Sequence, residues 1–287
     1  MKKIVTILFM VLSIAIGGNV YAQRYSYDFG TTANSLTTGS STSFFPALPS
    51  GGATYARVGT GAGSINLVDG SPNLDGSTGM QFNGVAPTAA SVNKAAFNTI
   101  TGAGQTFGIE FDLHLSGGSL GTWYFFLGNG ATFANSNGFT GAEVFVGLRF
   151  VFGASSAITT SYRNGGSWSA APVGSPSAQA TTYKVAIYAN NSTSSVNYTH
   201  PAGGTSYSVA ADKFDLFIDG TLVGNDLSKA ALGAATNIDD FMFYGESSTG
   251  NVAKIDIDNL QYTTNIASSP LPIELADFTA QTSNGDV

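Results

Sequence analysis

From residue 24 onward, apolar and polar positions alternate with the two-residue period of β-strands. In residues 25–29, aromatic side chains alternate with Ser26 and Asp28, which predicts a first strand. Turn signals such as Asp69-Gly70 separate the apolar runs that follow. These runs predict strands at residues 65–68, 80–82, 94–97, 106–115, 122–127, 143–152, 157–162, 183–189, 213–218, 238–244 and 252–262.

Two of the apolar runs, residues 123–127 and 150–152, are apolar on both faces. We expect them to be central strands whose outer side either is covered by a loop or forms a binding face. Residues 36–63 are rich in Gly, Ser, Thr and Pro. We expect them to form an extended surface loop with Phe44 and Phe45 tucked inward.

About a dozen strands and no long amphipathic helix predict an all-β fold. The expected architecture is a jelly-roll β-sandwich of two antiparallel sheets over residues 23–266. The best helix candidate, residues 225–232, covers one or two turns at most. A body of about 240 residues is long enough to bury a large core without disulfides.

Residues 1–22 have the pattern of a secretory signal peptide. Lys2 and Lys3 precede an apolar run at residues 4–16, and small residues ending at Ala22 follow. The run is short for a membrane span. We therefore expect cleavage after Ala22 and a protein that is secreted or held at the outer cell surface.

Residues 267–287 are expected to form a linker and the start of a second β module. Pro270 and Pro272 favour an extended spacer, and new apolar positions and an Asn-Gly-Asp turn follow them. A lone strand and turn are not stable in water. The pattern therefore predicts further C-terminal modules beyond Val287.

The charge balance of the chain is acidic. Without Lys2 and Lys3, 9 of the 11 basic residues remain against 18 acidic ones, a formal charge of about −9. Such a surface repels nucleic acid and anionic lipid, so we expect neither nucleic-acid binding nor membrane insertion. With 2 His and no Cys, a zinc site is not expected either.

Several segments resemble secreted jelly-roll domains. Residues 213–224 form a strand, an Asp-Gly turn and a strand like the hairpin of laminin-G-like and concanavalin-like domains, and residues 255–260 resemble their closing strand. Residues 27–29 and 237–241 resemble jelly-roll domains of Bacteroidetes-type secreted proteins. In those proteins a phrase like residues 271–280 often starts the module ahead of a type IX secretion signal. The resemblance implies the fold and the export route by analogy, and it specifies no ligand.

Glu110, Asp112 and His114 share one face of the strand predicted at residues 106–115, and Glu110 and Asp112 are the catalytic candidates. Jelly-roll hydrolases similar to family-16 glycosidases carry Glu-x-Asp-x-Glu or Glu-x-Asp-x-x-Glu on a strand. Here His114 or Leu115 stands in place of the second Glu, so the expected acid/base is missing. The alternative is the polar outer face of an ordinary sandwich strand.

Asp256 and Asp258 lie on one face of the predicted closing strand, and Asp28 of the first strand could lie beside them. Calcium prefers oxygen ligands such as carboxylates. Jelly-roll modules often carry a structural calcium ion, so these three residues are candidate calcium ligands. The alternative is a solvated outer face, and no other cofactor is expected.

Tyr162, Arg163, Asn164 and Trp168 lie in or beside a Gly-rich turn, which is expected at a loop tip. Aromatic platforms beside hydrogen-bonding side chains suit sugars, whose rings have apolar faces and hydroxyl edges. These four residues are therefore candidate ligand-binding residues. The alternative is an aromatic cap at the end of the sandwich, and Trp123 is expected in the core.

The leading hypothesis is a non-catalytic binding or adhesion module outside the cell, with an extracellular glycan or surface polymer as its partner. The first alternative is a glycoside hydrolase of concanavalin-like fold that uses Glu110 and Asp112. The second is a structural stalk domain with no small ligand.

Overall fold

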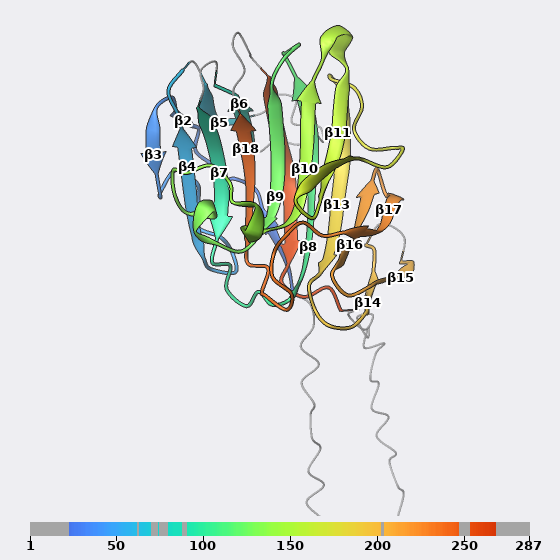
Figure 1. Cartoon of the computed structure of the whole chain (residues 1–287). Coiled ribbons are helices and arrows are strands. Elements are labelled where there is room, and N and C mark those ends of the chain that lie inside the picture. The colour runs from blue at the N-terminus through green and yellow to red at the C-terminus, as the bar shows by residue number, and fades with distance from the viewer. Residues whose placement is uncertain are drawn as a thin grey trace, which may run out of the picture.

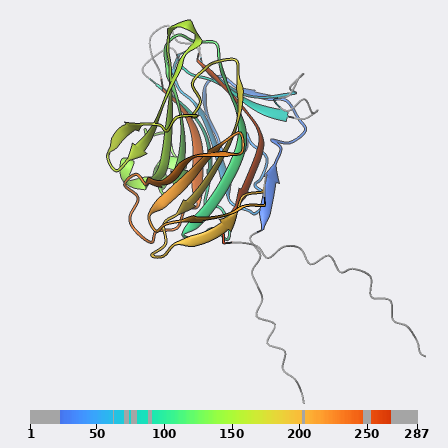
Figure 2. The same ribbon diagram turned by 90° about the vertical axis from the view of Figure 1, so that its right-hand side faces the viewer.

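The chain forms two antiparallel β-sheets packed face to face (Figure 1), and the two layers are seen from their side in Figure 2. The computed structural model describes residues 23–61, 63–69, 74, 80–87, 91–201, 204–246 and 253–267. The signal peptide expected at residues 1–22 and the module start expected after residue 267 lie outside the described residues. The predicted all-β sandwich is confirmed, with 19 strands in the described part rather than about a dozen.

Nine strands form one sheet, called sheet A here. They are β1 (Arg24–Tyr27), β2 (Asn34–Leu36), β5 (Ser64–Asp69), β6 (Met80–Val85), β8 (Thr106–Ser116), β13 (Thr182–Asn190), β16 (Lys213–Ile218), β17 (Thr221–Ser228) and β19 (Lys254–Thr263). The order is β17-β16-β13-β8-β19-β6-β5-β2, and β1 pairs with the second half of β19. The long strands β8 and β19 therefore lie at the centre of the sheet.

Eight strands form sheet B, the layer whose strands run across the front of Figure 1. They are β3 (Gly39–Ser41), β4 (Ala53–Val58), β7 (Val92–Asn98), β9 (Thr122–Gly128), β10 (Val144–Phe152), β11 (Ile158–Asn164), β12 (Ser167–Ala170) and β18 (Asp240–Glu246). Their order is β12-β11-β10-β9-β18-β7-β4-β3. The strands predicted to be apolar on both faces, β9 and β10, are central in this sheet, as expected.

The remaining elements are short. A two-stranded hairpin consists of β14 (Val196–Thr199) and β15 (Ser206–Val209), and the 3-10 turns are η1 (Ala131–Phe133), η2 (Gly141–Glu143) and η3 (Ala154–Ser156). The hairpin covers part of the outer face of sheet A, where Tyr198 stacks on Tyr188 with ring centroids 4.3 Å apart. None of the helices in the described residues has the length and apolar content needed to cross a membrane.

The main core fills the space between the two sheets with inward-facing apolar side chains. On β8, Ile109 and Phe111 point into this core while Glu110 points outward, as the alternation predicted. Trp123 of β9 is fully buried there and donates its Nε1 proton to the carbonyl of Ala253 at 3.0 Å. Burial of one such large side chain contributes about 2–3 kcal/mol, which makes the core the main source of stability.

A second apolar cluster lies on the outer face of sheet B, under the segment called the strap here (residues 129–143). The strap includes η1 and η2, whose short green turns pass in front of sheet B in Figure 1. Phe133 of the strap is fully buried, and Phe139 packs on Phe126 of β9 with ring centroids 4.5 Å apart. Of the two alternatives expected for the outer side of β9, the strap provides the covering loop.

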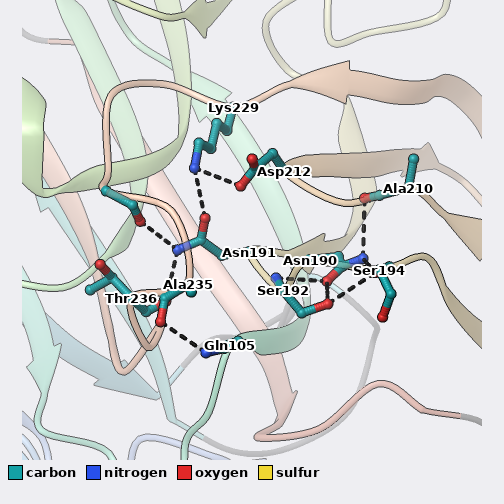
Figure 3. Close-up of polar contacts among 11 residues, drawn as sticks. Gln105, Asn190, Asn191, Ser192, Ser194, Ala210, Asp212, Lys229, Ala235 and Thr236 are labelled. Carbon is teal, nitrogen blue, oxygen red and sulfur yellow. Dashed lines mark hydrogen bonds and ion pairs between the residues drawn. The ribbon is translucent and has the colours of Figure 1, made fainter.

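Buried amides at the end of β13 hold several loops together (Figure 3). The Nδ2 group of Asn191 donates to the carbonyls of Gly233 and Thr236 at 2.9 and 2.7 Å. The Nζ group of Lys229 donates to Asn191 Oδ1 at 2.8 Å and to Asp212 Oδ1 at 2.7 Å. Because the side chain of Asn191 is fully buried, these bonds fix the loop before β18 against sheet A.

Two sequence expectations about local structure were wrong. Residues 36–63 are not one extended loop, because they contain β3 and β4, although Phe44 and Phe45 are buried as expected. The first half of the helix candidate at residues 225–232 lies in β17, which pairs with β16, and the rest is not helical. In both cases the pairing with a neighbouring strand outweighs the local composition.

Candidate functional site

Glu110, Asp112 and His114 lie in a row on the outer face of sheet A, as the sequence predicted. Glu110 accepts a hydrogen bond from the Tyr188 hydroxyl at 2.6 Å and pairs with Arg24 Nη2 at 2.5 Å. Both of its oxygens therefore have partners. This arrangement favours a structural role for Glu110, since a free carboxylate would suit an acid or base better.

Asp112 is almost fully buried beside Glu110. It accepts a hydrogen bond from Asn259 Nδ2 at 2.9 Å, and Lys184 Nζ lies 4.0 Å from it. The hollow between Glu110, Asp112 and His200 has a volume of about 120 Å³. Sites for small molecules usually measure about 300–1,000 Å³. The hollow is therefore small for a sugar ring.

The three candidate calcium ligands are not gathered into one group. Asp256 accepts from Asn83 Nδ2 at 2.5 Å and lies 3.2 Å from His114 Nδ1. Asp258 is buried and accepts a hydrogen bond from the main-chain N–H of Asn259. Asp28 is exposed and accepts one from the main-chain N–H of Gly30. Within the described part of the chain, no three His, Asp or Glu side chains cluster in a way that could hold a metal ion. A calcium site here stays a prediction.

The Asp256 contacts belong to a row of hydrogen bonds that crosses the outer face of sheet A. Ser35 Oγ donates to Asn66 Oδ1 at 2.7 Å, and Asn66 Nδ2 donates to Asn83 Oδ1 at 3.1 Å. Asn83 then donates to Asp256, which contacts His114. The polar side chains of this row therefore satisfy one another.

The four candidate ligand-binding residues lie on the β11–β12 hairpin but do not share one face. Tyr162 packs inward against the core and contacts Phe214 edge-on at 6.2 Å. Arg163 and Trp168 are paired across the hairpin and face outward from sheet B. Asn164 is exposed beside the turn. The structure thus brings Arg163 and Trp168 together and places Tyr162 on the opposite face.

Arg163 and Trp168 are part of a larger surface on sheet B, called the arginine face here. It consists of the outward side chains Tyr124, Arg149, Ser161, Arg163, Trp168 and Glu246. Strand register builds it, because Arg149 of β10 is opposite both Tyr124 of β9 and Ser161 of β11. Neighbouring strands lie about 4.8 Å apart, which brings these side chains into contact.

Trp168 lies half-buried in the middle of the arginine face. Its ring centroid is 5.6 Å from that of Tyr124. The Cζ atoms of Arg149 and Arg163 lie 4.7 and 5.4 Å from the Trp168 ring centroid. A cation within about 6 Å of an aromatic ring is attracted to it, so the indole holds both guanidinium groups in place.

Gly147 makes room for Arg163 on this face. A Cβ atom at Gly147 would lie 3.0 Å from Arg163 Cβ and 3.2 Å from Phe126 Cε1, closer than ordinary contacts. The side chain of Arg163 extends toward the strap, where its Cζ atom lies 5.3 Å from the Phe139 ring centroid. Any larger residue at position 147 would therefore displace Arg163 or Phe126.

The outer face of sheet B carries much of the positive charge of the chain, together with the acidic residues Glu246 and Asp240. Arg57, Lys94, Arg149 and Arg163 all face outward there, which is four of the nine Lys and Arg residues that follow residue 22. Burial lowers the pKa of Arg163, and the positive charge of Arg149 lowers it further, while Tyr124 raises it. Within this face, Arg149 and Arg163 lie side by side on the Trp168 ring.

Lys94 of β7 binds the strap to the outer face of sheet B. The Lys94 side chain is fully buried, and its Nζ group donates to the carbonyls of Thr132 and Asn135 at 2.7 and 3.1 Å. Glu143, at the end of the strap, accepts from the Thr132 amide at 2.9 Å and from its hydroxyl. The strap is therefore fastened at several points, and the arginine face lies beside it.

Sequence reasoning missed Arg149, Tyr124, Ser161 and Glu246. These residues come from four strands, and only the register of the sheet brings them together. One signal was available in the sequence. Arg149 is a charged residue in the middle of the apolar run 144–152, where a charged side chain is unusual unless it has a structural or functional role.

The comparisons with known proteins give only distant likenesses. No protein-family model and no characterised protein sequence matches the chain. A Trypanosoma rangeli sialidase is 14% identical over 72% of this chain and 28% of its own, with a TM-score of 0.40. The legume lectin-like domain from Entamoeba histolytica is 7% identical over 63% of this chain and 82% of its own (TM-score 0.35). The Emp47p carbohydrate recognition domain is 8% identical over 85% of this chain and 97% of its own (TM-score 0.40).

Likenesses at these TM-scores do not show what this chain binds. The chain matches less than a third of the sialidase, so the activity of that enzyme is not transferred to it. The resemblance to Bacteroidetes-type secreted proteins and the type IX export route stay predictions.

Proposed function

We propose that this chain is an exported, non-catalytic module that binds a glycan on the arginine face. The observation that supports the proposal most strongly is the half-buried Trp168 on the outer face of sheet B, flanked by Arg149 and Arg163. Sugars have apolar ring faces and hydroxyl edges, so they suit aromatic side chains that stand beside hydrogen-bond donors. The arginine face offers both kinds of group.

The opposite side of the molecule supports the proposal by contrast. On sheet A the polar row from Ser35 to His114 is engaged in hydrogen bonds within the protein, and the β14–β15 hairpin covers a further part of the sheet. Glu110 is bound to Arg24 and Tyr188. A glycoside hydrolase that uses Glu110 and Asp112 would have to break these contacts, so we place it second.

The test is binding of the purified protein to a glycan array and to immobilised polysaccharides. We expect the wild-type protein to bind a defined subset of glycans. Trp168→Ala should weaken that binding at least about tenfold, because a central aromatic side chain commonly dominates an interface. Tyr207→Ala serves as the control, since Tyr207 is a partly buried aromatic residue on the β14–β15 hairpin.

Two results would count against the proposal. Equal binding by wild type and Trp168→Ala would place the glycan elsewhere on the molecule. If neither the array nor the polysaccharides retained the wild-type protein, the structural stalk domain would become the better account.

A further inference from the structure

Two guanidinium groups of the arginine face share one indole ring. The Cζ atoms of Arg149 and Arg163 lie 4.7 and 5.4 Å from the centroid of the Trp168 ring. Arginine stays protonated throughout the physiological pH range, so two positive charges are held close together. Their repulsion is stronger than in bulk water, because both side chains are partly removed from solvent.

No carboxylate of the described residues forms an ion pair with either arginine. The ion pairs of the described residues join Arg24 with Glu110, His114 with Asp256, Lys184 with Asp112, and Lys229 with Asp212. Glu246, the acidic member of the arginine face, accepts a hydrogen bond from the Tyr124 hydroxyl at 2.6 Å. Among the described residues, the two arginines therefore have no ion-pair partner.

Both arginines also have an unused donor. The Nε atoms of Arg149 and Arg163 are buried and have no hydrogen-bond acceptor among the described residues. Arg149 Nη2 donates to Ser161 Oγ at 3.3 Å. Buried donors without acceptors are rare in folded proteins and costly. Strand register and Gly147 hold the two guanidinium groups in place before any ligand arrives. The Nε atoms themselves are buried, so a ligand would meet the outer part of each guanidinium group.

We propose that the arginine face binds acidic glycans, with a carboxylate or sulfate group of the sugar against Arg149 and Arg163. A guanidinium group presents parallel N–H donors that match two oxygens of such an anion. The half-buried Trp168, packed on the buried Tyr124, offers apolar contact to the sugar ring beside it. This inference rests on the proposed function and narrows it from glycans in general to acidic ones.

The overall negative charge of the chain does not oppose this ligand. At physiological salt, the effect of exposed charges fades within about 8 Å. The acidic residues outside the face are therefore screened from a bound sugar, while the two guanidinium groups would touch it directly. The distribution of charge matters here more than its sum.

A purely structural role for the arginines makes a different prediction. Arginine stacked on tryptophan stabilises folded proteins without any ligand. In that case substitutions would lower the melting temperature and leave ligand preference unchanged. Affinity and thermal unfolding must therefore both be measured on the same variants.

The experiment is isothermal titration calorimetry with three probes: oligogalacturonate, its fully methyl-esterified neutral form, and a sulfated galactan oligosaccharide. The proteins are wild type, Arg149→Gln, Arg163→Gln, Arg149→Lys and the control Lys254→Gln. Lys254 is an exposed residue of sheet A, so its loss changes the net charge equally without touching the face.

We expect wild type and Lys254→Gln to bind at least one of the charged probes and not the neutral one. Each Gln variant should lose about tenfold or more in affinity, since hydrogen bonds to charged groups are the strong ones. Arg149→Lys should recover part of the loss, because it keeps the charge without the planar fork. The preferred charged probe identifies carboxylate or sulfate as the recognised group.

Other outcomes overturn one or both proposals. Equal binding of charged and neutral probes, with unchanged affinity in folded Arg variants, would refute acidic selectivity and leave glycan binding intact. Binding of the charged probes that Lys254→Gln weakens as much as the Arg variants would mean a diffuse charge effect, which contradicts the arginine site. If wild type bound none of the probes, acidic recognition would be refuted, and the glycan array would decide the broader proposal.

Discussion

Lys94 is a fully buried lysine on β7, and its ammonium group holds the strap against sheet B. Its two hydrogen bonds go to main-chain carbonyls of the strap, and no carboxylate of the described residues forms an ion pair with it. Burial lowers its pKa from 10.5 to about 8, with the charge of nearby Arg57 acting in the same direction and that of Glu143 opposing it. The folded protein therefore gives up this proton more easily than the unfolded chain does.

The pH dependence of stability follows from this difference. Between pH 8 and 10.5 the unfolded chain keeps a proton on Lys94 that the folded protein has lost, so the free energy of unfolding rises with pH. Between pH 8 and 10.5, the free energy of unfolding of wild type should rise by about 3 kcal/mol relative to that of Lys94→Met. Urea unfolding at several pH values measures this. A difference between the two proteins that stays constant with pH would contradict the account.

At the scale of single residues, the sequence identified local pairs and missed distant ones. Arg163 and Trp168 are separated by a short Gly-Gly turn, so a hairpin brings them together whatever the rest of the sheet does. Arg149 and Tyr124 meet Trp168 only through the register of β9, β10 and β11. Register depends on the whole core, which local patterns do not specify.

The strap is the element that separates the covered part of sheet B from its open part. Phe133 anchors it in the cluster around Tyr124, Phe126 and Tyr244. Without the strap, several aromatic rings of the sheet would face water. The apolar outer sides of β9 and β18 are therefore explained by the strap rather than by a ligand.

Truncation of the strap anchor tests this division. Phe133→Ala should lower the free energy of unfolding by about 3–4 kcal/mol, because it removes a fully buried aromatic ring and leaves a cavity. In Phe133→Ala, amide hydrogen exchange should be faster in residues 129–143 than in β9. A loss below about 1 kcal/mol, which is typical of surface substitutions, would show that the strap is not anchored there.

At the scale of elements, aromatic and alternating strands were predictable and short polar strands were not. β8, β9 and β19 carry strong period-two or apolar patterns. β3 has the sequence Gly-Ser-Ser and exists because β4 pairs with it. β17 was mistaken for a helix candidate, since its register shifts and the positive φ of Asp226 disturb the alternation.

The whole molecule has two unlike outer faces. Sheet A presents polar side chains that bond to one another, and sheet B presents aromatic side chains and two arginines that stack on Trp168. Composition predicted an acidic exterior, and it could not reveal that four basic residues gather on one face. That asymmetry is a property of the fold, because each of these residues lies on a different strand.

The central claim is that an acidic glycan binds at the arginine face, and tryptophan fluorescence tests it most directly. The chain has 2 Trp residues; Trp123 is sealed in the core, and Trp168 is half-buried on the face. Titration with oligogalacturonate or sulfated galactan oligosaccharide should change the emission of wild type until saturation. The change should vanish in Trp168→Phe, in which Trp123 is the remaining fluorophore. An equal change in Trp168→Phe, or binding by calorimetry with no change in wild type, would contradict the claim.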